Sequence, residues 1–324
     1  MESQQDLNAG IEDSPSSIGP VAAEKALKIP LKNVGIDSYP FQMQSKLKLR
    51  GFNFNIMVVG CSGLGKTTYI NSLFGSNLVK HEVHQDDNGT TQIKLNNFTL
   101  TENGIHMHLN LIDTPGFGLG INNENAMENI LKYIKEQYTL YLRRELTAAR
   151  EKFIVDTRVH CILYFISPSG HSLKPLDILA LKLLGDICNV IPVIAKADAL
   201  TIDEKIAFKK RVQEEFQFHG IRLYPFDSDP YHPDKERTKL EDDELQKILD
   251  EQLVLNQRIR DLMPFAVIGS ENMVSLDGKE GGKSNLINNV VVRGRKTFWG
   301  AIINIEDPNH CEFTHLKRFL LQYF

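Results

Sequence analysis

The feature that most constrains this chain is a glycine-rich stretch between an apolar run and a helical pattern. The run FNIMVVG, which ends at Gly60, is typical of a buried strand in a mostly parallel sheet. It continues as GCSGLGKT over 60–67, which fits the pattern GxxxxGK[ST], and a helical stretch begins at Thr68. In this context the pattern predicts a phosphate-binding loop, and the alternative is a chance glycine-rich turn.

Each part of this loop suits the binding of phosphate. The glycines let successive backbone N–H groups curve around phosphate oxygens, and the following helix adds the positive end of its dipole. Lys66 would reach the β and γ phosphates, and the Thr67 hydroxyl would ligate Mg²⁺. The predicted phosphate-binding residues are Gly60, Cys61, Ser62, Gly63, Leu64, Gly65, Lys66, Thr67 and Thr68.

A second motif, Asp113-Thr-Pro-Gly116, follows a strand-like stretch of alternating apolar and polar residues at 105–112. An acidic residue at the end of a second strand is where a nucleotide triphosphatase holds magnesium, directly or through water. Gly116 could then offer its N–H to the terminal phosphate. Alone the motif is weak, because Asp and Gly are ordinary turn residues, but its place after the phosphate loop strengthens it.

A third motif, Ala195-Lys196-Ala197-Asp198, ends the apolar run VIPVIAKAD. The Asp198 carboxylate can accept hydrogen bonds from N1–H and N2–H₂ of guanine, whereas adenine offers no such pair of donors. Lys196 would lay its apolar stem over the base. In isolation these residues could be a surface Lys and Asp after a strand, but the order of the three motifs is that of a GTPase.

A switch threonine is expected between the first two motifs. The stretch DDNGTT at 86–91 offers Thr90 and Thr91, either of which could complete the magnesium shell and touch the γ-phosphate. Spacing alone does not choose between them, and a plain solvated loop is a competing interpretation.

Strand and helix patterns alternate through most of the chain, which predicts right-handed βαβ units and a doubly wound sheet. Residues after Ile268 form short strand-like runs and a last amphipathic piece, interpreted as a separate C-terminal element. Strands are predicted at 93–100, 105–112, 159–166, 190–195, 221–226, 265–268, 272–276 and 287–292, and helices at 122–150, 175–185, 202–218, 243–262 and 313–323.

The first fifty residues divide by charge. Residues 1–24 carry five acidic side chains and no Lys or Arg, which predicts a disordered acidic tail. Residues 25–50 carry six basic side chains against one acid. Lys46, Lys48 and Arg50 alternate with leucines, so on a strand they would share one face toward anionic lipids. The alternative is a solvated edge that guards the first strand.

Composition narrows the class of protein. The 324 residues are 42% apolar and 24% charged with a net charge of −4, which predicts a large core and no nucleic-acid partner. No run reaches the ~18 apolar residues of a membrane span, and the N-terminus lacks the pattern of a signal peptide. Four scattered cysteines without a CxxC pair indicate reduced thiols in an intracellular protein.

On these motifs the sequence resembles the septin family, and most closely the fungal cell-division-cycle septins that lack a C-terminal coiled coil. The resemblance covers about residues 33–323 and rests on GCSGLGKTTYINSLF, DTPGFG, TRVHCILYFISPSGHSLKPLDI, VIPVIAKADALTIDE, PFAVIGSEN and RGRKTFWGAIINIEDPNHCEF. It implies an α/β fold, a P-loop GTPase doubly wound sheet with a small C-terminal septin-unique β/α element. The expected domains are an acidic tail at 1–24, a basic lead-in at 25–50, a septin-type G domain at 51–268 and a shortened septin-unique element at 269–324.

Residue by residue, the resemblance implies a bound guanine nucleotide, GTP or GDP, with Mg²⁺. It assigns Gly269 to contact with the base, Arg295 to packing on it, and Thr90 to the switch threonine. Magnesium would be held by Thr67, Thr90 and Asp113. The base-binding stretch extends over Lys196, Ala197, Asp198, Ala199, Leu200, Thr201, Ile202, Asp203 and Glu204.

The resemblance also implies partners. His171 matches a loop histidine that in septins reaches toward the nucleotide of the neighbouring subunit, and Trp299 lies in the septin-unique segment of the same interface. The stretch Lys46–Arg50 resembles the polybasic segment of septins, which is linked with anionic lipids. Other septin subunits and anionic membrane lipids are therefore the expected partners.

Three functions are open to such a chain. The first is a GTP-binding cytoskeletal protein that assembles into filaments near the membrane, in a septin ring at the septum or bud neck, as a scaffold for cytokinesis. The second is a monomeric GTPase switch, and the third is a lipid-binding scaffold with a dead nucleotide site. Phe117 stands where small signalling GTPases carry a water-orienting Gln, so we expect slow hydrolysis supported by Lys66 and Thr90, below about one turnover per second. The intact Asp113 and Asp198 argue against a dead site.

Overall fold

The computed structural model describes residues 39–75, 93–102, 104–114, 116, 124–147, 153–226, 243–275, 291–297 and 301–322. The chain divides into two compact units, residues 1–47 and 48–324, and the second holds the sheet and every helix after the first. The predicted acidic tail at 1–24 lies outside the described residues, as do Thr90, Phe117 and Trp299.

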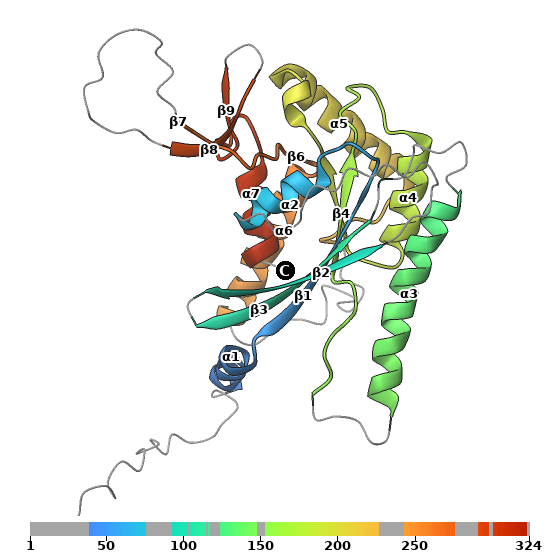
Figure 1. Cartoon of the computed structure of the whole chain (residues 1–324), viewed down its shortest axis with the longest axis vertical. Helices are drawn as coiled ribbons and strands as arrows, with labels where there is room; N and C mark the ends of the chain where they lie inside the picture. Colours follow the sequence, from blue (N-terminus) through green and yellow to red (C-terminus); the bar gives the residue numbers. More distant parts are fainter. Residues whose placement is uncertain are drawn as a thin grey trace, which may run out of the picture. The chain divides into compact units, whose positions relative to one another are not determined.

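A six-stranded sheet in the order β2-β3-β1-β4-β5-β6 forms the centre of the second unit (Figure 1). Neighbouring strands run parallel except β2, which pairs antiparallel with β3. Central strands β4 and β5 are buried along their whole length, which explains their continuous apolar sequences. The strands are β1 (Phe52–Gly60), β2 (Lys94–Glu102), β3 (Ile105–Asp113), β4 (Cys161–Ile166), β5 (Val190–Ile194) and β6 (Phe265–Ala266).

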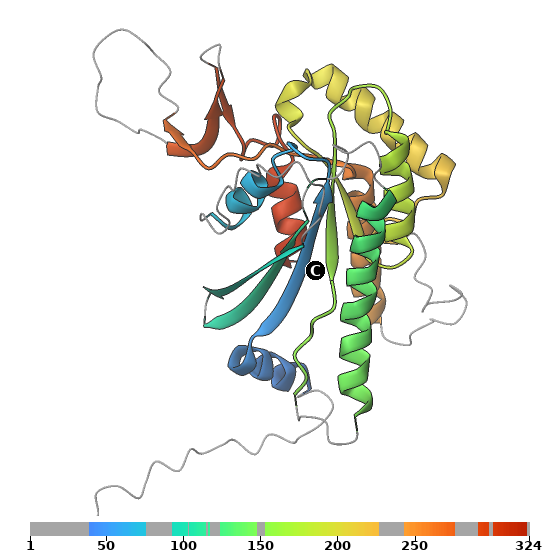
Figure 2. The same ribbon diagram turned by 45° about the vertical axis from the view of Figure 1, so that its right-hand side comes forward.

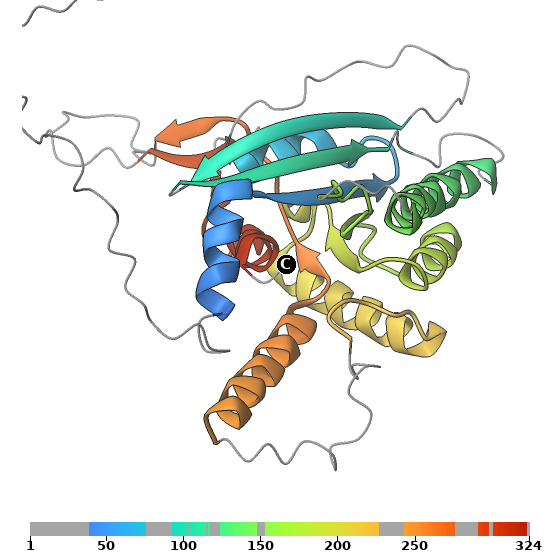
Figure 3. The same cartoon turned by 90° about the horizontal axis from the view of Figure 1, so that it is seen from below.

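Helices lie on both faces of this sheet, which confirms the predicted doubly wound α/β class (Figures 1, 2 and 3). The helices are α2 (Lys66–Phe74), α3 (Glu124–Leu146), α4 (Pro175–Gly185), α5 (Ile202–His219), α6 (Asp243–Leu262) and α7 (Phe313–Gln322), with a 3₁₀ turn, η2 (Ala197–Ala199). Helices α2 and α7 lie on one side of β1, and α3 and α4 lie on the other (Figure 2). Ile130 and Ile134 of α3 are fully buried, as the apolar stripe of that helix predicts.

The C-terminal element contains a second, antiparallel sheet in the order β7-β8-β9. Its strands are β7 (Met273–Ser275), β8 (Val291–Lys296) and β9 (Ile302–Asn304). Two strands were expected here. Strand β8 extends through the sequence RGRK, and β9 was not predicted.

One predicted strand is wrong, and the conditional alignment of Lys46, Lys48 and Arg50 on a strand does not hold. Residues 221–226 form no strand, since Pro225 has no N–H to donate to a sheet. Residues 46–50 belong to helix α1 (Tyr39–Arg50). Side chains on a helix advance by about 100° per residue, so Lys46 and Arg50 share a face while Lys48 points away from them. The three charges are therefore not aligned as a strand would align them.

Membrane insertion was not expected from the sequence. Within the described ranges, no helix has both the length and the apolar character needed to cross a bilayer.

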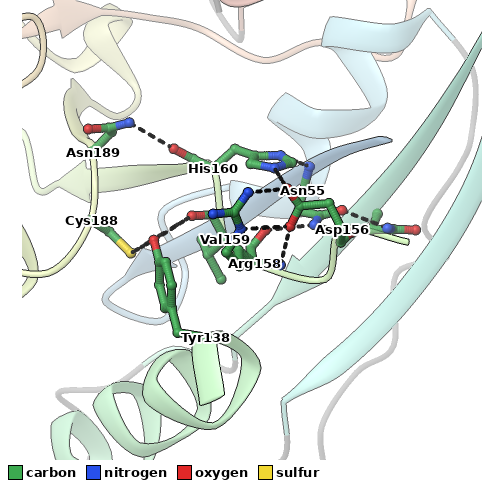
Figure 4. A network of polar contacts seen from close by, with 9 residues as sticks. Asn55, Tyr138, Asp156, Arg158, Val159, His160, Cys188 and Asn189 are labelled. Atoms are coloured by element: carbon green, nitrogen blue, oxygen red, sulfur yellow. Dashed lines mark hydrogen bonds and ion pairs between the residues drawn. The ribbon is translucent and has the colours of Figure 1, made fainter. Parts of the chain in front are cut away.

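A polar network joins the first half of β1 to the segment that precedes β4 (Figure 4). The Asn55 side-chain amide in β1 donates to the carbonyl oxygens of Asp156 and Arg158, at 3.0 and 2.6 Å. The backbone N–H of Asn55 donates to His160 Nδ1 at 3.0 Å. Tyr138 of α3 donates its hydroxyl to the Val159 carbonyl at 3.1 Å. One asparagine thus ties β1 to the segment that leads into β4.

Asp156 carries the main charge of this network. Arg158 binds its two carboxylate oxygens through Nε and Nη2, at 3.0 and 2.7 Å, and His160 Nε2 lies 3.3 Å from the same carboxylate. Burial alone would raise the pKa of Asp156, but the hydrogen bonds from Arg158 and His160 outweigh it and lower that pKa to about 2. The carboxylate is therefore ionised and paired at neutral pH.

Candidate functional site

The predicted phosphate loop joins the end of β1 to the start of α2. A Cβ on Gly60 would lie 2.7 Å from the Phe165 carbonyl oxygen, so only glycine fits where the loop leaves the sheet. Gly65, with φ of 82°, is the N-cap of α2, and the next residue, Lys66, opens the helix. The loop therefore directs the N-terminus of α2 toward the carboxyl edge of the sheet, where phosphate would bind.

The side chain of Lys66 packs against the phosphate loop. Its Nζ donates to the carbonyl oxygens of Gly60 and Cys61, each at 3.0 Å, and the side chain is 8% exposed. Burial lowers the pKa of Lys66, and the nearby carboxylate of Asp113 opposes that shift. The lysine and the predicted magnesium ligand thus interact electrostatically across the loop.

The segment that contains Asp113, Thr114 and Gly116 contacts the phosphate loop. The Thr114 hydroxyl donates to the Val58 carbonyl of β1 at 2.7 Å, which fixes the end of β3. A Cβ on Gly116 would lie 2.2 Å from the Cα of Ser62, so only glycine allows this contact. Thr67 lies at the start of α2, half-buried, beside the same loop. Two of the three predicted magnesium ligands, Thr67 and Asp113, therefore lie next to the phosphate loop.

A pocket of about 350 Å³ opens beside this loop, at the carboxyl ends of β4, β5 and β6. Seven of its lining residues were predicted from the sequence: Leu64, Gly65, Thr68, Lys196, Asp198, Gly269 and Arg295. Eight were not: Tyr69, Phe165, Ala195, Val267, Ile268, Ser270, Glu271 and Asn272. Apart from Tyr69, which lies in α2, the missed residues follow or end parallel strands, and that position is the signal that could have identified them.

Asp198 is the chemically distinctive group of the pocket. Its Oδ2 accepts a hydrogen bond from Arg295 Nη1 at 2.9 Å, and the side chain is 13% exposed. Its Oδ1 is buried and has no hydrogen-bond partner among the described residues. Leaving a buried carboxylate oxygen unpaired is unfavourable, so this atom is suited to a donor on a ligand. The donor edge of guanine supplies such a group, and the residues present fit this base.

Lys196 adopts a backbone conformation that L-residues rarely adopt, with φ of 46°. It is the only non-glycine residue with positive φ among the described residues, and it lines the pocket directly before Asp198. Strain of this kind persists where the surrounding structure requires it and is frequent at binding sites.

The remaining predicted base-binding residues do not line this pocket. Thr201 and Glu204 form a capping box that starts α5: the Glu204 N–H donates to the Thr201 hydroxyl, and Glu204 accepts from the Thr201 N–H. Ala197, Leu200 and Ile202 line a neighbouring cavity of about 160 Å³. Ala199 and Asp203 are exposed. The stretch after Asp198 therefore starts α5 and lines this second cavity, and it does not line the base pocket.

His171, the predicted partner-facing residue, is exposed on the loop between β4 and α4. Cys61 of the phosphate loop is partly buried, and burial raises the pKa of its thiol.

A phosphate loop after β1, an acidic residue at the end of β3 and a base pocket at the ends of β5 and β6 define a P-loop nucleotide-binding protein of the α/β class. The family model described as Septin matches residues 50–324. The chain therefore belongs to the septin family, which is a family of GTP-binding proteins.

Individual relatives agree with this assignment. Cell division control protein 10 of Candida albicans is 47% identical over 295 residues, which cover 90% of this chain and 74% of the relative. Septin homolog spn2 of Schizosaccharomyces pombe is 46% identical over 293 residues, 89% of this chain and 80% of the relative. A crystal structure of the septin GTPase domain from Chlamydomonas reinhardtii matches with a TM-score of 0.54 and 23% identity, covering 83% of this chain and 91% of that one. This last likeness shows the fold.

Proposed function

We propose that this chain is a guanine-nucleotide-binding cytoskeletal subunit that assembles with other septins and serves as a scaffold in septum formation and cytokinesis. The observation that carries the nucleotide assignment is the buried, unpaired Oδ1 of Asp198 inside a pocket next to a phosphate loop. Membership of the septin family supports assembly into hetero-oligomers. The name of the Candida albicans relative refers to control of cell division.

Guanine would be selected by the Asp198 carboxylate. Arg295 already occupies one side of Oδ2, which leaves Oδ1 and the second lone pair of Oδ2 for the two donors of the base. Adenine lacks this donor pair, so its binding would leave Oδ1 buried and unpaired. Gly269 lines the same pocket, and a Cβ there would lie 3.0 Å from the backbone of Tyr69, so a larger residue would fit tightly at this position.

The phosphates would be held by the backbone of Gly60–Thr68 and by Lys66. Thr67 and Asp113 would ligate Mg²⁺, and Thr90 remains the proposed switch threonine. When bound, Mg²⁺ neutralises phosphate charge. Lys66 already turns its ammonium toward the loop, so it needs little reorganisation to meet phosphate oxygens. Hydrolysis would be slow, and a turnover above about one per second without a partner would favour a monomeric switch instead.

The subunit would act at the cell cortex, in the septin cytoskeleton at the septum or bud neck. His171 and the Trp299 segment would face a neighbouring septin on the nucleotide side. Lys46, Lys48 and Arg50 of α1 would contribute weak attraction to anionic lipids, about 1 kcal/mol each. The helix buries none of its residues, so its charges stay available to a surface. Repetition along a filament would strengthen this attachment.

Substitution of Asp198 by Asn tests the base assignment. The amide donates where the carboxylate accepted, so Asp198→Asn should weaken GTP binding about 100-fold and admit xanthosine triphosphate, whose C2 carbonyl accepts. Titration with fluorescent nucleotides measures both affinities. Asp186→Asn, which changes an exposed carboxylate after α4, is the matched control and should bind GTP as the wild type does. Unchanged GTP affinity in Asp198→Asn would remove the guanine assignment.

A further inference from the structure

The first part of β3 carries two histidines at alternate positions, His106 and His108. Strand β3 pairs with β2, which forms one edge of the six-stranded sheet (Figures 1 and 3). Side chains two residues apart on a strand leave the same face of the sheet. His106 is exposed and His108 is half-buried, whereas Leu109, on the opposite face, is fully buried. Two imidazole rings therefore lie side by side on a part of the sheet that solvent reaches.

A threonine on the neighbouring strand binds one nitrogen of each ring. Thr101 lies directly opposite His106, and Thr99 lies opposite His108. The Thr101 hydroxyl and His106 Nδ1 share a hydrogen bond of 2.9 Å, and the Thr99 hydroxyl and His108 Nδ1 share one of 3.3 Å. Among the described residues, neither Nε2 has a hydrogen-bond or ion-pair partner. Both rings are thus held at Nδ1 and unoccupied at Nε2.

This arrangement is the one that a metal-binding histidine adopts. Such a ring donates its other N–H to an outer partner, which fixes the tautomer and the orientation of the ring. When Nδ1–H donates to the threonine hydroxyl, the lone pair of the ring is at Nε2, where a metal ion can bind. Imidazole nitrogen is a favoured ligand of Cu²⁺, Ni²⁺ and Zn²⁺. Within the described ranges no cluster of three or more His, Cys, Asp or Glu suits a metal ion, so water would complete the coordination.

The spacing of the two rings allows one ion to bind both. Alternate residues of a strand lie about 7 Å apart. Imidazole nitrogens bind a metal ion at about 2 Å, which brings two such nitrogens to roughly 3 Å from each other. Each ring tip then has to move by about 2 Å, which a side-chain rotation of about 20° supplies. Rotations of this size stay within one staggered rotamer.

We propose that His106 and His108 form a binding site for one divalent transition-metal ion, with Cu²⁺ preferred, and that Thr101 and Thr99 orient the two rings. Copper binds nitrogen ligands more tightly than the other divalent ions of its row and accepts a tetragonal geometry that includes water. Structural zinc sites use four protein ligands, which two imidazoles do not supply. The site lies toward the opposite end of β3 from Asp113, about 17 Å along the strand from His108. It is therefore separate from the proposed nucleotide site.

Electron paramagnetic resonance of the full chain with one equivalent of CuCl₂ tests this site directly. The wild type should show two equatorial nitrogen ligands, and Cu²⁺ should raise its thermal midpoint, because the ion binds the folded state. His106→Gln and His108→Gln should each leave one nitrogen ligand and lower the Cu²⁺ affinity about 100-fold. His315→Gln removes an exposed histidine of α7 and is the matched control, which should bind Cu²⁺ as the wild type does.

The threonines are tested separately. The double variant Thr99→Val/Thr101→Val keeps both imidazoles and the β-branched shape of the side chains, and it should lower the Cu²⁺ affinity about tenfold. Unchanged affinity in this variant would show that the threonines do not orient the rings. If the wild type shows no nitrogen ligands, or if His106→Gln binds Cu²⁺ as tightly as the wild type, the metal site is refuted. Guanine-nucleotide content, measured by chromatography in every variant, reports on the proposed function independently of this result.

Discussion

The ion pair between Lys209 and Glu312 predicts how strongly the C-terminal segment stabilises the sheet. Lys209 Nζ on α5 donates to Glu312 Oε1 at 2.5 Å and to the Leu262 carbonyl at 2.8 Å. Glu312 precedes α7, and its Oε2 accepts the N–H of Ala266 in β6 at 2.7 Å. The two side chains are 12% and 14% exposed. One carboxylate thus joins α5, β6 and the start of α7 away from solvent.

Glu312→Gln keeps the shape of this side chain and removes its charge. The Lys209 ammonium would then stay buried without a counter-charge, a change that costs about 3–5 kcal/mol when one partner of a buried pair is lost. The amide still offers an acceptor, so we expect the lower end, about 3 kcal/mol. For a folded unit of this size, such a loss lowers the thermal midpoint by roughly 6–9 °C.

The pH dependence distinguishes a lost charge from lost packing. Burial lowers the pKa of Lys209, and Glu312 partly opposes that shift. Without Glu312 the pKa falls further, so the unfolded chain binds more protons than the folded chain up to about pH 10.4. Stability of Glu312→Gln should therefore rise with pH, and its deficit relative to the wild type should shrink at alkaline pH.

Circular dichroism during urea and thermal unfolding, at pH 7 and pH 9.5, measures both effects. Adding Lys209→Met to Glu312→Gln should recover most of the loss, because no unpaired charge remains. A deficit below about 1 kcal/mol at pH 7, or one that stays constant with pH, would refute the argument from the buried charge.

Two further predictions concern groups far from the pocket. Replacing Lys46, Lys48 and Arg50 together by Gln should abolish sedimentation with anionic liposomes while leaving nucleotide content unchanged, and undiminished sedimentation would remove lipids from the proposal. The depressed pKa of Asp156, about 2, means that its contribution to stability is present above pH 4 and is lost as pH falls toward 2. Asp156→Asn should therefore lower the free energy of unfolding by about 1 kcal/mol at pH 7, after allowance for solvent screening. In thermal unfolding its stability should also fall less steeply than that of the wild type between pH 4 and 2. An equally steep loss in acid would contradict the role of Asp156 with Arg158.

The parts of the site that obey local rules could be predicted from the sequence. The loop at Gly60–Thr68 needs glycine freedom, a lysine and a helix start in one short stretch, so its pattern is complete within a few residues. Asp198 was predicted from its chemistry because a carboxylate after a strand suits a donor edge. Glu271 and Phe165 were missed, because their place in the pocket depends on which strand ends the topology brings together.

The errors in the fold have a related cause. The alternation of Lys and Leu at 46–50 would align three charges on a strand, but these residues lie in α1. This helix buries no residue, so no apolar face selects between the two periods. At 221–226 the apolar run is real, and Ile221 is buried, but Pro225 lacks the donor that a strand needs. A hydrophobic pattern predicts which residues are buried. It predicts a strand or a helix only where the backbone can also form the hydrogen bonds of that element.

The contacts of the base pocket bear on the predicted boundary between the G domain and the C-terminal element, at 268/269. Ser270 directly after this boundary donates its N–H to the Ser72 hydroxyl of α2 at 2.8 Å and its own hydroxyl to the Gly294 carbonyl of β8 at 2.6 Å. The strand that receives this bond also carries Arg295, which binds Asp198 across a sequence separation of 97 residues. The helix that starts at the phosphate loop therefore positions, through Ser270, the strand that completes the base pocket. A nucleotide that binds both ends of this connection would stabilise both segments at once, so the two predicted domains would act as one unit toward such a ligand.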